Sequence, residues 1–207
     1  MTMIDISSAT IEDLLEAIRS DQDEIFTQLV TRYHRGLVSL ARTFLREGEA
    51  EEVVQEAWIS AYENISKFEG RSSIRTWLAQ IVMNAARMRL RKAGREINLD
   101  FSSGETDALS NRFTEDGKWR DPPLDWEINS PDELLQEQNL LDCLHKTLEK
   151  LPVNQKLVLE LRDVQGLELD DICTTLAISA ANVRVLLHRA RARLFNMVDH
   201  YQETGEC

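Results

Sequence analysis

The fold of this chain is decided by residues 169–194, which read LDDICTTLAISAANVRVLLHRARARL. Apolar residues at intervals of three and four predict two short helices, the first from about Glu168 to Ala177 and the second after the turn at Ser179. Ile178 and Ser179 form the turn between them, and the Ser179 hydroxyl is suited to cap the second helix. The stretch is therefore predicted to be a helix–turn–helix.

The second helix of this pair combines an apolar stripe with basic flanks. The stripe consists of Val183, Leu186, Leu187, Ala190 and Leu194. At about 100° per residue, one flank carries Arg184, His188 and Arg191, and the other carries Asn182, Arg189 and Arg193. Arginine can clamp guanine edges or phosphates and asparagine can read adenine, so this helix is suited to the DNA major groove. An amphipathic helix with solvated arginines is the alternative that the helix pair alone leaves open.

Charge is distributed unevenly along the chain. The 207 residues have a formal net charge of −12, yet residues 172–198 hold four arginines and no acid. Residues 96–137 hold twelve acids against three bases, a net charge of −9. A chain with basic helices and an acidic middle is expected to meet more than one partner.

Composition predicts an all-α protein of two small helical domains. Hydrophobic residues make up 43% of the chain, whereas glycine (8) and proline (4) are scarce. No apolar run approaches the roughly 20 residues that span a bilayer. The first residues lack a basic segment typical of a signal peptide, so we expect a cytoplasmic protein without membrane insertion.

The three cysteines, Cys143, Cys173 and Cys207, are far apart and lack the spacing of metal ligands. We expect Cys143 and Cys173 to be buried thiols and Cys207 to be frayed, without a disulfide or a metal site.

Residues 1–95 are predicted to form a domain of three or four helices. Thr10 with Asp13 resembles a capping box, and Asp21 with Glu24 repeats the pattern before a longer helix that we expect Gly48 to break. Another helix is predicted from Glu49 to about Ile65, and the last runs from Ile74 to about Ala93 after the loop KFEGRSS (67–73). The expected inner face of that last helix is Ile74, Trp77, Leu78, Ile81, Val82 and Ala85.

An acidic cluster opens the predicted helix 49–65 and includes no base. It consists of Glu47, Glu49, Glu51, Glu52 and Glu56. Acids stabilise a helix N-terminus, but five exceed that need. An exposed acidic face bearing Gln55 and Trp58 is equally typical of a docking surface for a basic partner, and the two interpretations stay open.

The distal end of the predicted helix 74–93 is basic. Residues 84–95, NAARMRLRKAGR, contain four arginines and one lysine and no acid. Phe68 and Trp77 precede this charge, and aromatic rings beside cations are typical of sites that stack single-stranded bases. We expect Phe68 to be exposed, whereas core packing is the favoured interpretation of Trp77.

Residues 96–130 are predicted to be a flexible acidic linker because they lack a sustained hydrophobic period. The linker holds Trp119 and Trp126, to which we assign no role. Ser130 and Pro131 are predicted to start a helix that runs to about Lys150. The expected divisions are residues 1–95, the linker 96–130, a second domain at 131–198 and a tail at 199–207.

The order of these segments resembles a known family. AEEVVQEAW (50–58), KFEGRSSIRTWLAQIVMNAAR (67–87), an acidic linker and then residues 151–194 are similar to the extracytoplasmic-function (ECF) sigma factors. That resemblance implies a non-enzymatic bacterial protein without cofactor or metal. It implies binding to core RNA polymerase, through the β′ clamp and the β flap, and to promoter DNA, under control of an anti-sigma factor.

The resemblance also implies roles for residues at matching positions. Those implied to bind core polymerase are Glu51, Glu52, Gln55, Glu56 and Trp58. Those implied to bind and melt the minus-10 element are Lys67, Phe68, Ser72, Ser73, Trp77, Asn84, Arg87, Arg89 and Arg91. Those implied to bind the minus-35 duplex are Ser179, Asn182, Arg184, His188, Arg189 and Arg191.

Two other function classes compete with this interpretation. A two-domain DNA-binding regulator would explain residues 169–194 but leaves the acidic helix and the basic segment 84–95 without a role. A protein-interaction module would leave the arginines solvated. A regulator should bind duplex DNA alone with a steep salt dependence, and an interaction module should bind neither DNA nor polymerase.

Overall fold

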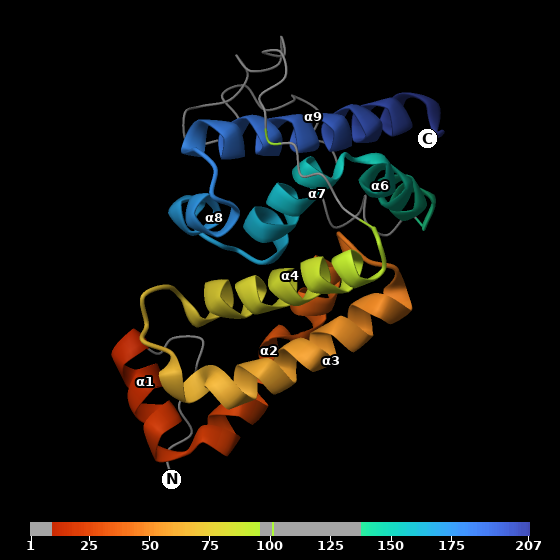
Figure 1. Cartoon of the computed structure of the whole chain (residues 1–207). Coiled ribbons are helices and arrows are strands. Elements are labelled where there is room, and N and C mark those ends of the chain that lie inside the picture. The colour runs from red at the N-terminus through yellow and green to blue at the C-terminus, as the bar shows by residue number, and fades with distance from the viewer. Residues whose placement is uncertain (1–9, 96–100, 102–137) are drawn as a thin grey trace. The chain divides into compact units, whose positions relative to one another are not determined.

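The described part of the protein consists of helices arranged in two compact units. The computed structural model describes residues 10–95, 101 and 138–207, and its regular elements in those ranges are all helical. The first unit holds the described residues up to 95 together with 160–171, and the second holds residue 101, 138–159 and 172–207. The predicted all-α fold is confirmed (Figure 1). The domain boundaries proposed from the sequence stay a prediction.

Three helices of the N-terminal segment, α1, α2 and α4, begin at capping side chains. The elements of this segment are α1 (Ile11–Ser20), α2 (Gln22–Arg42), α3 (Glu47–Asn64), the short 3₁₀ helix η1 (Ile65–Lys67) and α4 (Ile74–Lys92). Thr10 and Asp13 form the predicted capping box at α1, and the Ser73 hydroxyl accepts the N–H of Thr76 at the start of α4. These caps satisfy N–H groups that have no partner inside the helix.

Helices α2, α3 and α4 pack against one another around one core. Its fully buried large side chains include Leu29, Leu37 and Leu40 from α2, Val53 and Val54 from α3, and Leu78 from α4. Removing such apolar surface from water is the main favourable contribution to folding.

The predicted break at Gly48 is wrong. Gly48 lies inside α3, and the chain instead turns after Arg42. Thr43, Phe44 and Leu45 follow α2 directly and are all buried, so the turn places consecutive side chains in the core.

The buried face of α4 differs in phase from the predicted one. Ile74, Leu78 and Val82 are buried as expected, whereas Ile81 and Ala85 are only half-buried. Ala79, Met83 and Ala86 are buried instead, because α4 contacts both α2 and α3 and buries a broader face than one stripe.

The C-terminal segment ends in a long helix on which two others pack. Its elements are α6 (Gln138–Lys150), α7 (Val153–Leu159), the π-helical turn η4 (Glu160–Val164), α8 (Leu169–Leu176) and α9 (Ala180–Thr204). Both α6 and α7 contact α9. Helix α9 continues past Val198 to Thr204, and the predicted helix start at Ser130 lies outside the described residues.

The predicted helix–turn–helix is present as α8 and α9. Ser179 caps α9 as expected, because its hydroxyl accepts the N–H of Asn182 at 3.2 Å. Ala177 in the turn has φ of 55°, the left-handed conformation that residues other than glycine adopt at a cost.

The expectation of three unlinked thiols is wrong. Cys143 in α6 and Cys207, three residues beyond α9, form a disulfide with their Cα atoms 5.3 Å apart. Cys207 is not frayed, because the chain turns back toward α6 after the end of α9. Cys173 is half-buried and takes no part in this bond.

Candidate nucleic-acid interface

The acidic cluster of α3 is paired with arginines from other parts of the chain. Arg42 contacts Glu47 at 2.7 Å and Glu51 at 3.8 Å, and Arg95 contacts Glu49 at 2.5 Å. Arg89 bridges Glu52 at 3.1 Å and Glu56 at 2.9 Å. Every acid of the cluster therefore has a basic partner, which the local sequence does not reveal. The pairs to Arg89 and Arg95 join α3 to α4 and to the residues after it.

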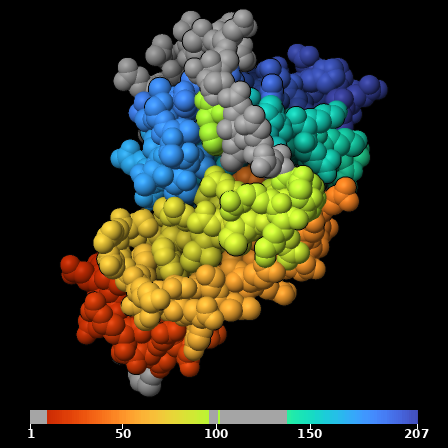
Figure 2. Space-filling view, in the orientation of Figure 1, coloured from red at the N-terminus to blue at the C-terminus, as the bar shows by residue number. Residues whose placement is uncertain are grey.

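Arg89 is shared between the two predicted sites. It was expected to bind DNA, yet two carboxylates expected to bind polymerase hold its guanidinium. Its hydrogen bond with Glu52, together with both carboxylate charges, raises the pKa of Arg89 above its ordinary value. The carboxylates themselves remain largely exposed. Figure 2 shows α4, in yellow to green, lying along α3, in orange.

Trp58 does not belong to the exposed acidic face, so that part of the expectation is wrong. Its exposed fraction is 8%, its Nε1 donates to Nδ1 of His34 at 3.2 Å, and its ring meets Phe26 edge-on at 5.3 Å. The outward side of α3 instead carries Glu51, Glu52, Gln55, Glu56 and Ile59.

Ile59 is the member of this surface that the sequence analysis missed. Its exposed fraction is 63%, although isoleucine is usually buried. It lies four residues after Gln55, one helical turn along the same side of α3. That spacing was a signal that could have placed it on the surface.

Phe68 is buried rather than exposed, which corrects the second aromatic expectation. Its exposed fraction is 7%, and its ring lies 5.5 Å from that of Trp77. The preceding 3₁₀ turn carries Phe68 inward, where its N–H donates to the carbonyl of Ile65 at 3.0 Å. Trp77 is half-buried, so only part of one indole and none of the Phe68 face is available for stacking.

The other loop residues and the basic end of α4 differ in accessibility. Lys67, Ser73, Asn84 and Arg91 are exposed, whereas Ser72, Arg87 and Arg89 are half-buried. Met88 is exposed among the basic side chains, as is unusual for methionine. Of the α4 residues implied to bind the minus-10 element, Asn84 and Arg91 are thus exposed and Arg87 is half-buried, whereas Arg89 is held by α3.

On α9, the predicted DNA-reading residues are not equivalent. Arg184 is exposed, whereas Arg189 and Arg191 are half-buried. The Asn182 amide donates to the backbone carbonyl of Phe101 at 3.1 Å, a bond it would have to exchange for one to a base. Arg193 donates to the buried Gln155 of α7 at 2.9 Å and so fixes α7 against α9.

His188 is a further correction. Its exposed fraction is 9%, so it does not stand on the basic flank that the helical wheel assigned to it. The contacts of α6 and α7 with α9 cover more of that helix than the single apolar stripe predicted. His188 is therefore left out of the proposed DNA-binding surface of α9.

Comparison with known families matches both helical segments. The Sigma-70 region 2 family matches residues 29–96, and the Sigma-70 region 4 family matches residues 141–194. The ECF RNA polymerase sigma-E factor of Escherichia coli K12 is 30% identical over 186 residues, which are 89% of this chain and 92% of that protein. This chain belongs to the ECF sigma factors. The RNA polymerase sigma-H factor of Pseudomonas aeruginosa is likewise 30% identical, over 87% of this sigma factor and 89% of its own length.

Solved structures share the fold of this sigma factor. CnrH in complex with the cytosolic domain of CnrY is 24% identical, with a TM-score of 0.55 over 90% of this chain and 96% of that one. The sigma factor RpoE of Bartonella quintana, in complex with the anti-sigma factor NepR, is 20% identical with a TM-score of 0.56. It covers 84% of this chain and 96% of its own.

Metal-binding clusters and membrane-spanning helices are both absent from the described ranges. Residues 10–95, 101 and 138–207 contain no group of three or more histidines, cysteines or acids that could hold a metal ion. None of the helices described is both long and apolar enough to cross a bilayer.

Proposed function

We propose that this sigma factor binds core RNA polymerase and directs it to a class of promoters, acting as a non-enzymatic subunit in the bacterial cytoplasm. The observation that carries the proposal is the match to Sigma-70 regions 2 and 4, in that order, on one chain. A DNA-binding regulator or an interaction module would require only one of these regions.

The proposed polymerase-docking face is the outward side of α3. It consists of Glu51, Glu52, Gln55, Glu56 and Ile59. Four polar side chains next to one exposed isoleucine resemble a protein interface, in which apolar contacts are bordered by polar groups. Their charge suits a basic partner, and the β′ clamp is the partner that the family resemblance implies. In this proposal Trp58 is buried beneath the face and does not contact the partner.

The proposed minus-10 surface combines the loop before α4 with the basic end of that helix. Asn84, Arg87 and Arg91 are placed to neutralise phosphates or read bases, and Met88 adds an apolar contact between them. Lys67, Ser72, Ser73 and the exposed part of Trp77 border the position for an unstacked base, whose extrusion costs a few kcal/mol. Phe68 forms the buried wall behind Trp77.

The proposed minus-35 surface is the N-terminal half of α9. It consists of Ser179, Asn182, Arg184, Arg189 and Arg191. Its side chains lie at the start of the second helix of a helix–turn–helix, the part that meets base edges in the major groove. The rest of the second domain is proposed to contact the β flap.

An anti-sigma factor is the proposed regulatory partner. Both solved neighbours are complexes, one with the cytosolic domain of CnrY and one with the anti-sigma factor NepR. Such a partner would control this sigma factor by covering its polymerase-binding surfaces.

Reconstitution with core RNA polymerase tests the proposed function. The purified full chain should form a stable complex with core polymerase and support transcription from a cognate promoter. A protein that binds duplex DNA tightly alone and does not bind polymerase would identify a regulator instead. A protein that binds neither would identify an interaction module.

Charge swapping separates docking from internal pairing. Reversing Glu52→Lys and Glu56→Lys should weaken core binding at least about tenfold, as expected for two interfacial charges. Adding Arg89→Glu restores opposite charges between α3 and α4 but leaves the outer face reversed, so core binding should stay weak. Recovery of core binding in the triple variant would show that the acids act only inside the fold. Glu16→Lys on the exposed side of α1 is the matched control.

A further inference from the structure

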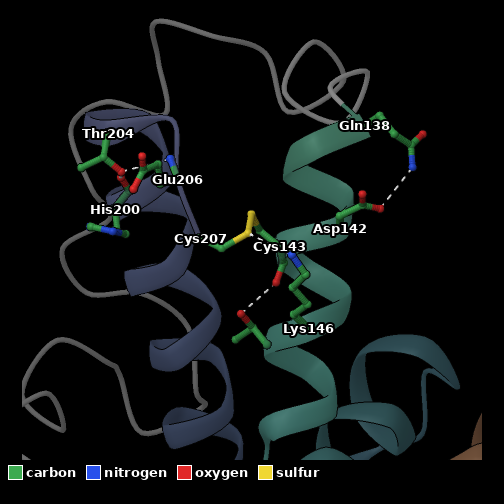
Figure 3. The surroundings of a disulfide bond; sticks show 9 residues. Gln138, Asp142, Cys143, Lys146, His200, Thr204, Glu206 and Cys207 are labelled. Carbon is green, nitrogen blue, oxygen red and sulfur yellow. Dashed lines mark hydrogen bonds between the residues drawn. A yellow bond between two sulfur atoms is a disulfide. The ribbon is translucent and has the colours of Figure 1, made fainter.

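The second unit contains a cysteine pair that the proposed function does not use. Figure 3 shows Cys143 on α6 bonded to Cys207, which follows the end of α9. Cys143 is 2% exposed and belongs to a core cluster with Leu140 and Tyr201. Cys207 is exposed. One sulfur is thus protected by the core while the other is accessible to a reagent.

A hydrogen-bonded turn places Cys207 over α6. Gly205 has φ of 71° and caps α9 by donating its N–H to the carbonyl of Tyr201 at 2.8 Å. The Thr204 hydroxyl donates to the carbonyl of His200 at 2.8 Å and accepts the N–H of Glu206 at 3.1 Å. The left-handed glycine ends the helix and reverses the chain, so the approach of the two cysteines is built into this turn.

A cation lies beside the accessible sulfur. Nζ of Lys146, one turn after Cys143 on α6, is 3.9 Å from Sγ of Cys207 (Figure 3). A neighbouring ammonium favours the thiolate, which is the attacking form in thiol–disulfide exchange. The exposed cysteine is therefore the one suited to meet an external disulfide first.

We infer that Cys143 and Cys207 are a redox-active pair, opened by thiol reductants and closed by disulfide oxidants. The inference rests on the proposed function in one respect, the reducing compartment in which polymerase works. Disulfides in such compartments are usually transient and redox-sensing rather than permanent. The pair joins α6 to the end of α9, so its state sets how firmly that helix end is held.

The exchange reaction balances with a disulfide as the oxidant. The Cys207 thiolate attacks a small disulfide, forming a mixed disulfide and releasing one thiolate. The Cys143 thiolate then attacks Sγ of Cys207, forming the intramolecular bond and releasing the second thiolate. Two protein thiols are oxidised, one external disulfide is reduced to two thiols, and the two cysteine protons pass to the released thiolates through water.

Equilibration in glutathione tests the inference on the full chain, without polymerase or DNA. The protein is incubated at several ratios of reduced to oxidised glutathione, quenched with acid and labelled with a maleimide that retards it in a gel. Two cysteines per chain should lose their maleimide label together as the oxidised fraction of glutathione rises. A mass spectrum should then contain the 143–207 cross-linked peptide. Because the test contains no promoter or polymerase, its failure is distinguishable from failure of the proposed function.

Three variants sharpen the measurement. Cys173→Ser should keep the two-label transition, and Cys207→Ser, at an exposed position that need not disturb folding, should abolish it. Gly205→Ala should disfavour closure roughly tenfold, because alanine resists the left-handed conformation of this turn. Oxidised wild type should also melt at least about 5 °C above its reduced form, with no such difference in Cys207→Ser.

Two results would overturn the inference. Absence of the 143–207 peptide in excess oxidised glutathione would show that the pair does not close. Persistence of the bond in the folded protein under excess reduced glutathione would show a permanent cross-link.

Discussion

Trp58 is a residue whose position in the family pattern and whose position in the fold give different expectations. Its indole is buried, with hydrogen-bonding and aromatic contacts to α2. We therefore expect Trp58→Ala to lower the free energy of unfolding by about 3–5 kcal/mol. Urea unfolding followed by circular dichroism measures this loss, and Gln55→Ala on the exposed side should stay within about 0.5 kcal/mol of wild type. Wild-type stability in Trp58→Ala would contradict the buried role.

Ala177 carries backbone strain at the turn of the helix–turn–helix. Its φ of 55° costs an L-residue about 1–2 kcal/mol, whereas glycine adopts it freely but loses about 0.5–1 kcal/mol more chain entropy on folding. Ala177→Gly should therefore raise the free energy of unfolding by roughly 0.5 kcal/mol. The matched control is Ala181→Gly, exposed within α9, which should destabilise by about 1 kcal/mol. An equal loss of unfolding free energy in both variants would show that the backbone at Ala177 is not strained.

The exposure of single side chains was the least predictable feature of this protein. The helical wheel placed His188 on a surface flank, and the loop position of Phe68 suggested exposure, yet both are buried. A wheel gives the relative angles of side chains on one helix but not how many neighbours cover it. Burial of these residues depends on packing between segments distant in sequence, which one stretch does not encode.

At the scale of elements, the pairing of α3 with the end of α4 should depend on pH. The hydrogen bond from Arg95 lowers the pKa of Glu49 below its ordinary 4.5. A lowered folded-state pKa stabilises the fold above the unfolded value, and that contribution disappears as pH falls through the lowered pKa. The stability difference between wild type and Arg95→Ala should thus shrink from neutral pH to about pH 3 in urea titrations. A difference that does not change with pH would exclude the pair as its source.

Helix starts were predictable because caps are local. Thr10, Ser73 and Ser179 each lie three residues before the residue whose N–H they accept, so the sequence shows both partners at once. The end of α2 was not predictable in this way. It follows from the burial of Phe44 and Leu45, which requires the rest of the core. The family pattern located the candidate surfaces, and side-chain packing decided which members are accessible.

For the whole molecule, the net charge of −12 opposes binding to DNA by the free protein. Each phosphate contact contributes about −0.9 to the slope of log K against log salt. Arg184→Ala should reduce the magnitude of that slope by about 1 for promoter binding by the polymerase complex. Filter binding at several salt concentrations measures it, with Arg19→Ala on α1 as the control. An unchanged slope would remove Arg184 from the phosphate contacts.

The role expected for the acidic linker, residues 96–130, rests on its sequence. Its acids and tryptophans, including Trp119 and Trp126, lie outside the described residues. The hypothesis from the sequence is that the linker mimics a phosphate chain in the polymerase cleft. Neutralising Asp116, Asp121 and Asp125 should then alter abortive synthesis or promoter escape. Unchanged product ratios in a transcription assay would count against it.

The length of α9 separates the sites at its two ends. From Asn182 to Thr204 the helix rises about 33 Å, at 1.5 Å per residue, so a chemical event beside Cys207 occurs far from any base. Only a tilt or rotation of the whole of α9 could couple the disulfide to the proposed DNA-binding residues. Oxidised and reduced protein should therefore release equal numbers of counterions from the minus-35 duplex. Any difference between the two forms should appear in the residence time on DNA, because the proposed arginine contacts to phosphate stay the same while the C-terminal end of α9 is held less firmly in the reduced form.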